Sequence, residues 1–333
     1  MKYKRVLLIS SLIIFNLSLA FAQNRIHTVK EDIPRDSIRL SDPFVLADEE
    51  TSIYYMTGTG GLLWKSKDLE KWTGPFEVTK TDPDSWMGKN PMIWAAELHK
   101  YKGKYYYFAT FTNRGVIIDT VKGNKIERRA SHVLVSDKPD GPYVPMDDPT
   151  YLPPDKPTLD GTLWVDTDGN PYMIYCHEWL QNWNGTMEKI ELKPDLSGSL
   201  GEGEVLFRAS DSPWSKENNE KGSVIPNKVT DGPWLFRTQT GKLGMLWTSW
   251  IHNVYAQGVA YSESGRLDGP WIHEEELITP PDYGHGMMFR TFDGRLLMSA
   301  HSHMEDKNGR YIRIPHLFEV DDSGNKIKTG NPF

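Results

Sequence analysis

The sequence contains a single cysteine, Cys176, in 333 residues. One thiol cannot form a disulfide within the chain, and neither a cysteine cluster nor an HExxH pattern is present to indicate a zinc site. Cys176 ends the apolar run Tyr-Met-Ile-Tyr-Cys, which is typical of a buried strand. We therefore expect it to be a small core residue and not a nucleophile.

An excess of positive charge is also missing. The chain has 38 Lys and Arg against 45 Asp and Glu, which gives a net charge of −7. A nucleic-acid-binding protein normally carries a basic surface, and an anionic membrane attracts positively charged segments. The charge balance therefore argues against both partners. A content of 38% hydrophobic and 25% charged residues is typical of an ordinary globular chain.

Long apolar runs are absent except at the N-terminus. Three basic residues among the first five precede an apolar stretch over 6–19, and Ala-Phe-Ala ending at Ala22 fits a cleavage site. This order is typical of a secretory signal peptide, and the apolar run is short for a membrane span. We therefore expect a signal peptide over 1–22, a single domain over 23–333, and a secreted or periplasmic protein without a membrane anchor.

Amphipathic helices are not evident, whereas short strand-like runs are frequent. No long segment combines a 3.6-residue apolar period with helix caps. Short aromatic or aliphatic runs alternate instead with turn signals such as Lys-Gly-Lys, Asp-Gly-Asn, Thr-Gly-Lys and Asp-Gly-Arg. The pattern predicts an all-β chain.

One plan recurs five times: a polar residue, a strand, a turn and a second apolar strand. The polar residues that open these units are Asp42, Glu97, Asp160, Asp231 and His285. A repeat of about 60 residues suits a four-stranded blade, and a β-propeller arranges such blades around a channel. The sequence thus predicts a five-bladed β-propeller with four-stranded antiparallel blades. We expect the five side chains to converge at one mouth, although an Asp beside Gly also caps ordinary turns.

Four of these positions lie in short motifs that resemble those of glycoside hydrolase family 43, a family of five-bladed propellers. The motifs are Ser41-Asp42-Pro43, Trp94-Ala-Ala-Glu97, Leu159-Asp160-Gly161 and Gly284-His285-Gly286. The resemblance implies that Asp42 is the general base that acts on water. It implies that Asp160 orients the general acid and raises its pKa, and that His285 faces an axial metal ion, often calcium. No organic cofactor is expected.

The acid position departs from the family pattern. The family uses Glu, usually in Glu-Gly-Pro, where this chain has Asp231-Gly-Pro-Trp. Asp is one methylene shorter, so its carboxyl falls about 1.5 Å short, a cost on the order of 10²-fold in rate if nothing compensates. Three interpretations stay open: Asp231 is the acid, Glu178 supplies the proton, or the protein binds sugar and hydrolyses it poorly.

Aromatic and charged residues near these motifs are candidates for substrate binding. Tryptophan offers an apolar face to a sugar ring, although core packing is its commoner role. Glu97 is expected to orient a ligand or support the fold, and Arg290 to reach a sugar hydroxyl. The candidates are Trp94, Glu97, Glu178, Trp179 and Arg290.

The resemblance implies a secreted glycoside hydrolase acting on arabinofuranosides or xylosides of plant polysaccharides. In the implied inverting mechanism Asp42 deprotonates a water, Asp231 protonates the leaving oxygen, and Asp160 keeps that acid protonated. Inverting enzymes separate their two carboxyls by about 6.5–9.5 Å. The alternative is a carbohydrate-binding propeller without catalysis, in which the acid position has degenerated.

Overall fold

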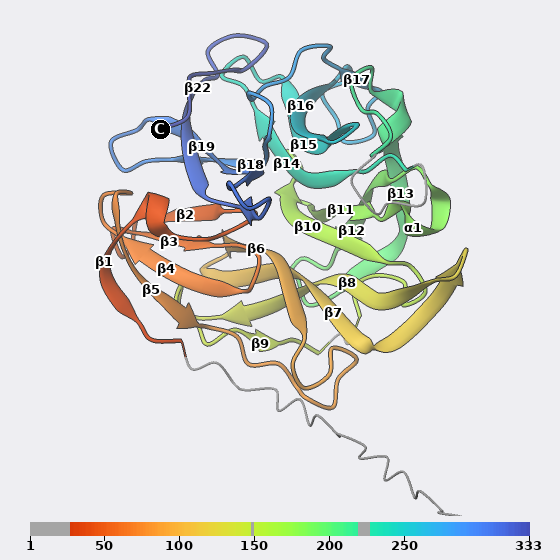
Figure 1. Cartoon of the computed structure of the whole chain (residues 1–333), viewed down its shortest axis with the longest axis horizontal. Helices are drawn as coiled ribbons and strands as arrows, with labels where there is room; N and C mark the ends of the chain where they lie inside the picture. The colour runs from red at the N-terminus through yellow and green to blue at the C-terminus, as the bar shows by residue number, and fades with distance from the viewer. Residues whose placement is uncertain (1–26, 148–149, 219–226) are drawn as a thin grey trace, which may run out of the picture.

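The computed structural model describes residues 27–147, 150–218 and 227–333. Five antiparallel sheets surround a central axis, as Figure 1 shows. The prediction of an all-β, five-bladed β-propeller is confirmed. The signal peptide predicted over residues 1–22 lies outside the described residues. Within the described part of the chain, no helix is long and apolar enough to cross a membrane.

Four strands form each blade, numbered from the axis outward. Blade one contains β2 (Phe44–Asp48), β3 (Ile53–Thr57), β4 (Leu62–Ser66) and β5 (Lys71–Glu77), with β1 (Lys30–Pro34) added at its outer edge. Blade two contains β6 (Met92–Tyr101), β7 (Lys104–Val121), β8 (Asn124–Ser136) and β9 (Val144–Pro145). Blade three contains β10 (Thr158–Val165), β11 (Pro171–His177), β12 (Thr186–Leu192) and β13 (Ser199–Arg208).

The last two blades follow the same order. Blade four contains β14 (Asp231–Arg237), β15 (Leu243–Ile251), β16 (Val254–Ser262) and β17 (Trp271–His273). Blade five contains β18 (Tyr283–Arg290), β19 (Leu296–Ser302), β22 (Pro315–Asp321) and β23 (Lys328–Thr329). A hairpin of β20 (Met304–Glu305) and β21 (Tyr311–Ile312) lies between β19 and β22. The helical segments are η1 (Arg35–Ser37), α1 (Trp179–Asn182) and η2 (Ala209–Asp211).

The start of each innermost strand carries one residue in the left-handed backbone conformation. These residues are Asp42, Ala95, Asp160, Gly232 and His285, with φ between 41° and 57°. In blades two to five a shift in strand register accompanies this residue, as in a β-bulge. Non-glycine residues in this conformation cost about 1–3 kcal/mol each and often occur at functional sites.

Hydrogen bonds between neighbouring blades hold four of these five residues. A side chain on or just after a blade's second strand accepts the N–H of the left-handed residue in the next blade. The pairs are Ala95 N with Thr59 Oγ1 at 2.9 Å, Asp160 N with Thr110 Oγ1 at 2.8 Å, His285 N with Thr248 Oγ1 at 2.9 Å, and Asp42 N with His301 Nδ1 at 3.0 Å. The mouth of the propeller is therefore built from residues that are fixed by adjacent blades.

This geometry corrects the repeat alignment at two positions. Ala95 and Gly232, and not Glu97 and Asp231, are equivalent to Asp42, Asp160 and His285. Asp231 comes one residue before the equivalent position and Glu97 two residues after it. The sequence pattern could not show this, because the register depends on where each bulge falls.

Large aromatic side chains fill the space between the blades. Trp72, Tyr107, Trp247 and Phe318 are among those that are fully buried. Cys176 is also fully buried and makes no disulfide, so its prediction as a core residue is confirmed. The core fixes the angle between blades and so supports the geometry of the mouth.

Candidate active site

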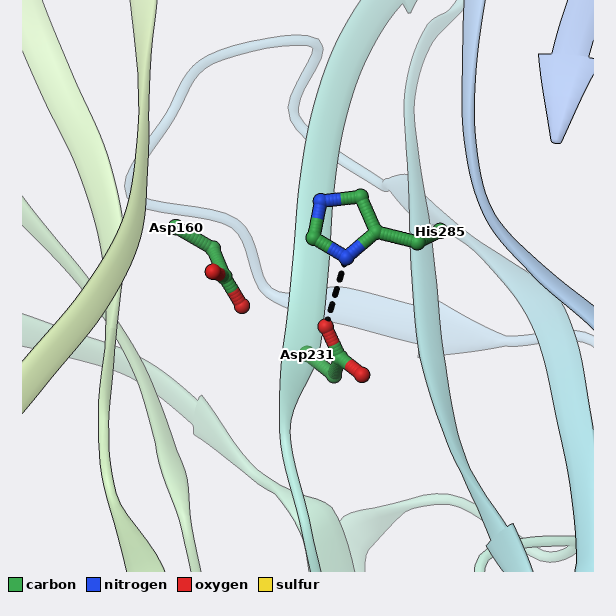
Figure 2. Close-up of side chains that lie close together, drawn as sticks. All are labelled: Asp160, Asp231 and His285. Carbon is green, nitrogen blue, oxygen red and sulfur yellow. Dashed lines mark hydrogen bonds and ion pairs between the residues drawn. The ribbon is translucent and has the colours of Figure 1, made fainter. Parts of the chain in front are cut away.

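Three aspartates and two histidines meet where the innermost strands begin. Asp42 precedes β2, Asp160 lies on β10, Asp231 opens β14, His285 lies on β18 and His301 on β19. Figure 2 shows the side chains of Asp160, Asp231 and His285 directed toward one another. The structure therefore brings together all three aspartates predicted to be catalytic.

The His285 imidazole lies between two carboxylates. Its Nδ1 is 2.8 Å from Asp231 Oδ1 and 3.2 Å from Asp42 Oδ1. Burial alone would lower the pKa of His285, but the negative charges of Asp42 and Asp231 outweigh it and raise the pKa well above its usual value. The ring is therefore an imidazolium that neutralises part of the charge of the two carboxylates.

Asp231 accepts two hydrogen bonds. Its Oδ1 accepts from His285, and its Oδ2 accepts from the Tyr255 hydroxyl at 2.6 Å, while the Asp160 carboxyl lies close by. Burial acts to raise the pKa of Asp231, but these donors outweigh burial and lower the pKa below its usual value. Asp231 is thus ionised in this arrangement.

Asp160 is the protonated partner of Asp231. Its side chain is buried, and burial followed by the charge of Asp231 raises its pKa well above the usual value for Asp. The backbone N–H of Gly232 donates to Asp160 Oδ2 at 3.3 Å. Two adjacent carboxyls that cannot both ionise share one proton, and their titration belongs to the pair.

Asp42 is held by blade one and by blade five. The Thr59 hydroxyl donates to its Oδ2, and its own N–H donates to His301 Nδ1. Burial lowers the pKa of His301 to about 4, so this ring is neutral and can accept the bond. Asp42 is 15% exposed and Asp231 21%, whereas Asp160 is nearly enclosed. Asp42 and Asp231 are therefore the carboxylates that can meet a ligand.

The spacing of Asp42 and Asp231 fits a shared reaction site. Their nearest oxygens flank one nitrogen at 3.2 and 2.8 Å, so these two oxygens lie at most about 6 Å apart. This is shorter than the separation of about 6.5–9.5 Å expected for inverting glycosidases. Asp42 thus faces a pair of carboxyls, Asp160 and Asp231, in which burial and mutual repulsion favour one bound proton. This arrangement offers the two functions that hydrolysis of a glycosidic bond requires, a base for water and an acid for the leaving oxygen.

Glu178 lies at the rim of the site in an ion pair. Arg129 Nη1 donates to its two carboxylate oxygens at 2.6 and 2.7 Å. The Arg129 guanidinium also stacks on the Trp94 ring, with its Cζ 4.0 Å from the ring centroid. Burial raises the pKa of Glu178 against the opposing charge of Arg129. The structure thus joins two predicted substrate-binding residues, Trp94 and Glu178, through an arginine.

Comparison with known proteins agrees with the geometry. Residues 33–321 match the model of "Glycosyl hydrolases family 43". The chain belongs to this family. The members of this family are glycoside hydrolases, so the carboxyl cluster at the mouth of the propeller is a candidate site for cleaving glycosidic bonds.

Several family 43 relatives resemble most of the chain. An endo-arabinase from Bacteroides thetaiotaomicron is 34% identical, with a TM-score of 0.75, and the match covers 87% of this chain and 97% of that one. A thermostable family-43 glycoside hydrolase is 20% identical with a TM-score of 0.72, covers 91% of this chain and 96% of that one, and shows the fold alone. A xylosidase/arabinosidase from Bacteroides ovatus is 24% identical over 61% of each chain.

The match to the curated relatives is partial in length. The chain matches 61% of the length of the Bacteroides ovatus protein and 31% of that of xylosidase/arabinosidase 43A from Humicola insolens, to which it is 30% identical over 33% of its own length. The substrates of these proteins are therefore not assigned to this chain by the matches.

The axial metal implied by the family does not fit these residues. The cavity next to the cluster, lined by Asp42, Glu97, Trp234 and His285 among others, has a volume of about 10 Å³, which is room for about one water. Calcium needs six to eight oxygen ligands, and this cavity has no room for the several waters that would have to supply most of them. The structure does bring Asp160, Asp231 and His285 together, with ligand atoms within 4.8 Å of one another.

Glu97 lies on β6, two residues after Ala95. It is buried, and its Oε2 is 2.7 Å from His99 Nε2. The His99 ring in turn stacks on Trp234 at 6.1 Å between centroids. Glu97 lines the small axial cavity and does not lie at the rim, so its contacts suit a supporting role.

The other two predicted substrate-binding residues, Trp179 and Arg290, lie at different distances from the carboxyl cluster. Trp179 begins α1, next to Glu178, and is half-buried at the rim. Arg290 ends β18, at the opposite end of the strand from His285, and its Nη2 pairs with Asp322 at 2.9 Å. The structure does not bring Arg290 to the cluster, because five residues of extended strand separate it from His285 by about 16 Å.

Sequence reasoning missed several residues that contact the predicted ones. Tyr255, His301, Thr59 and Arg129 all lie on or just after the second or third strands of their blades. Thr59 and His301, like Thr110 and Thr248, lie on or just after a second strand, and this recurrence is a repeat signal that the sequence does contain. Tyr255 and Arg129 have no repeat counterpart that would have singled them out.

Proposed function

We propose that this protein hydrolyses α-L-arabinofuranosyl linkages of plant polysaccharides, after secretion from the cell that makes it. The observation that carries the hydrolytic part is the position of Asp42 and Asp231 on two sides of His285 Nδ1, with the buried Asp160 carboxyl beside Asp231. The arabinofuranosyl substrate is supported by the similarity to the Bacteroides thetaiotaomicron endo-arabinase over 97% of that chain.

In the proposed reaction Asp42 is the general base. It takes a proton from a water molecule, and that water attacks the anomeric carbon on the face opposite the leaving group. The Thr59 hydroxyl and the Asp42 N–H bond to His301 fix the orientation of the carboxylate. Positioned proton transfer of this kind contributes about 10²- to 10⁴-fold to rate.

Asp231 delivers the proton to the leaving oxygen. Before the reaction the proton of the pair resides on Asp160, which is too enclosed to meet the substrate. As negative charge develops on the leaving oxygen, the proton passes from Asp160 to Asp231 and from Asp231 to that oxygen. His285 and Tyr255 then stabilise Asp231 as a carboxylate. After the reaction Asp42 releases to solvent the proton that it took from water, and solvent returns one proton to the Asp160–Asp231 pair, so both sites are restored for the next cycle.

Glu178 is the second candidate for the acid. Its raised pKa and its place at the rim favour it, whereas its ion pair with Arg129 opposes it. A third reading, a sugar-binding propeller without catalysis, requires that the Asp160–Asp231 pair cannot release its proton.

The experiment is product release from arabinan, xylan and their oligosaccharides by the wild type and the Asp42→Asn variant. We expect arabinose or arabino-oligosaccharides from the wild type and a loss of 10²- to 10⁴-fold in the variant. The anomer released first, read by proton NMR, tests inversion. Release of xylose alone would overturn the substrate assignment. Sugar binding without turnover on any substrate would support the non-catalytic reading.

A further inference from the structure

The Arg129 guanidinium is enclosed on two sides at the rim of the site. The Trp94 ring lies against one face, and Glu178 accepts from Nη1. Its Nε donates to Thr112 Oγ1 at 3.2 Å. The Arg129 and Glu178 side chains are only 11% and 12% exposed. Such a desolvated ion pair is weak evidence for a stabilising role, because desolvation offsets most of the attraction.

One end of the guanidinium is still available. Among the residues that the structure describes, none accepts a hydrogen bond from Nη2, and this atom is not one of the buried unpartnered ones. Arginine carries five N–H donors in a rigid planar fork. Nη2 therefore presents two oriented donors at the mouth, next to the acceptor oxygens of Glu178.

Arg129 is linked to both proposed catalytic residues through intervening contacts. Trp94, its stacking partner, directly precedes Ala95, whose N–H bonds Thr59, and Thr59 donates to Asp42. On the other side, the charge of Asp231 acts on Glu178. The pair joins β8 of blade two to the segment after β11 of blade three, so it spans the mouth beside the cluster.

We propose that Arg129 is a substrate-positioning residue whose Nη2 donates to a sugar hydroxyl while Glu178 accepts from a neighbouring hydroxyl of the same sugar. This rests on the proposed function, because it places a saccharide at this mouth. Adjacent donor and acceptor groups match a vicinal diol, and a fixed fork discriminates between hydroxyl orientations. Arg129 thereby contributes to sugar selectivity without taking part in proton transfer.

Affinity for arabinotriose, measured by isothermal titration calorimetry in the Asp42→Asn background, separates binding from chemistry. We expect Arg129→Lys and Arg129→Gln to weaken binding by about 10- to 100-fold, the size of a lost charge-assisted hydrogen bond. Lys keeps the charge but loses the fork. A dissociation constant within twofold of the parent for Arg129→Lys would overturn the proposal.

Two further variants control for folding. Arg128→Gln is the matched control, because Arg128 also stacks on a tryptophan, Trp86, with its Cζ 4.7 Å from the centroid, yet it points to the other face of β8. It should bind arabinotriose like the parent. The double variant Arg129→Gln/Glu178→Gln leaves no unpaired charge. Weak binding despite a restored melting temperature supports positioning, whereas restored binding would make the pair purely structural.

The same measurements distinguish a failure of the proposed hydrolytic function from a failure of the Arg129 proposal. If the wild type binds arabinotriose but never hydrolyses it, the hydrolytic proposal falls and the Arg129 comparison still stands. If the parent binds neither arabinotriose nor xylotriose, both proposals are overturned.

Discussion

Replacing Asp160 with Asn should make the protein more stable at neutral pH and almost inactive. Asn has the same shape and stays neutral, and its amide can still donate to Asp231. It cannot supply a proton, so the Asp160–Asp231 pair no longer holds one for the leaving oxygen. We expect kcat on arabinan to fall by about 10²- to 10⁴-fold.

The gain in stability follows from the pKa of Asp160, which the fold raises. An acid whose folded pKa is raised contributes stability below its unfolded pKa of about 3.9, and this stability is lost as pH rises toward the folded value. The loss is about 1.4 kcal/mol for each pH unit in that window. Asn does not titrate, so the variant does not lose this stability. Above about pH 4 its free energy of unfolding should therefore rise relative to that of the wild type by up to about 1.4 kcal/mol for each pH unit.

The assay is the free energy of unfolding in urea between pH 4 and pH 7. Asp48→Asn is the control, since hydrogen bonds from Thr51 and Tyr105 lower the pKa of Asp48 despite its burial, away from the Asp160–Asp231 pair, and its stabilising effect is fully present above about pH 4. That variant should be less stable than the wild type by a constant amount over pH 5–7. If the difference between Asp160→Asn and the wild type does not change with pH, Asp160 is not protonated in the fold and the reasoning fails.

Three other predictions follow from contacts of the site. Tyr255→Phe removes a donor from Asp231, so the pKa of Asp231 should rise and kcat should fall about tenfold with a shifted pH profile; an unchanged profile would remove Tyr255 from the site. Dialysis against a chelator should leave arabinan hydrolysis intact, because the axial cavity has room for about one water; a loss that calcium restores would contradict the fit. Arg290→Gln should leave KM and kcat unchanged and shift unfolding by less than about 1 kcal/mol, because its pair with Asp322 is half exposed; a raised KM would return Arg290 to the substrate site.

The propeller fold could be predicted from the sequence because the features that indicate it are local. Turn residues, short apolar runs and a repeat of about 60 residues are all read within one segment at a time. Asp42, Asp160 and His285 were accessible for the same reason, since each opens a repeat unit. Their left-handed backbone explains why the same position recurs: it turns each side chain out of its strand at the axis.

The remaining site residues depend on register, which sequence spacing does not define. Bulges shift the pairing of the first two strands, so Asp231 and Glu97 fall outside the equivalent positions. Arg290 was predicted to reach a sugar hydroxyl because it follows Gly284 by six residues, but an extended strand carries it away from the mouth. Arg129 was missed because its partner Glu178 belongs to another blade.

The source of the proton is the central claim, and leaving-group dependence tests it most directly. The measurement is kcat/KM of Asp231→Asn and Glu178→Gln on arabinan and on an aryl arabinofuranoside with an acidic phenol as leaving group. A missing general acid harms only the substrate whose leaving group needs protonation. We expect Asp231→Asn to lose at least about 10²-fold on arabinan and far less on the aryl glycoside, with Glu178→Gln affecting both alike. The reverse pattern would move the acid to Glu178 and contradict the account.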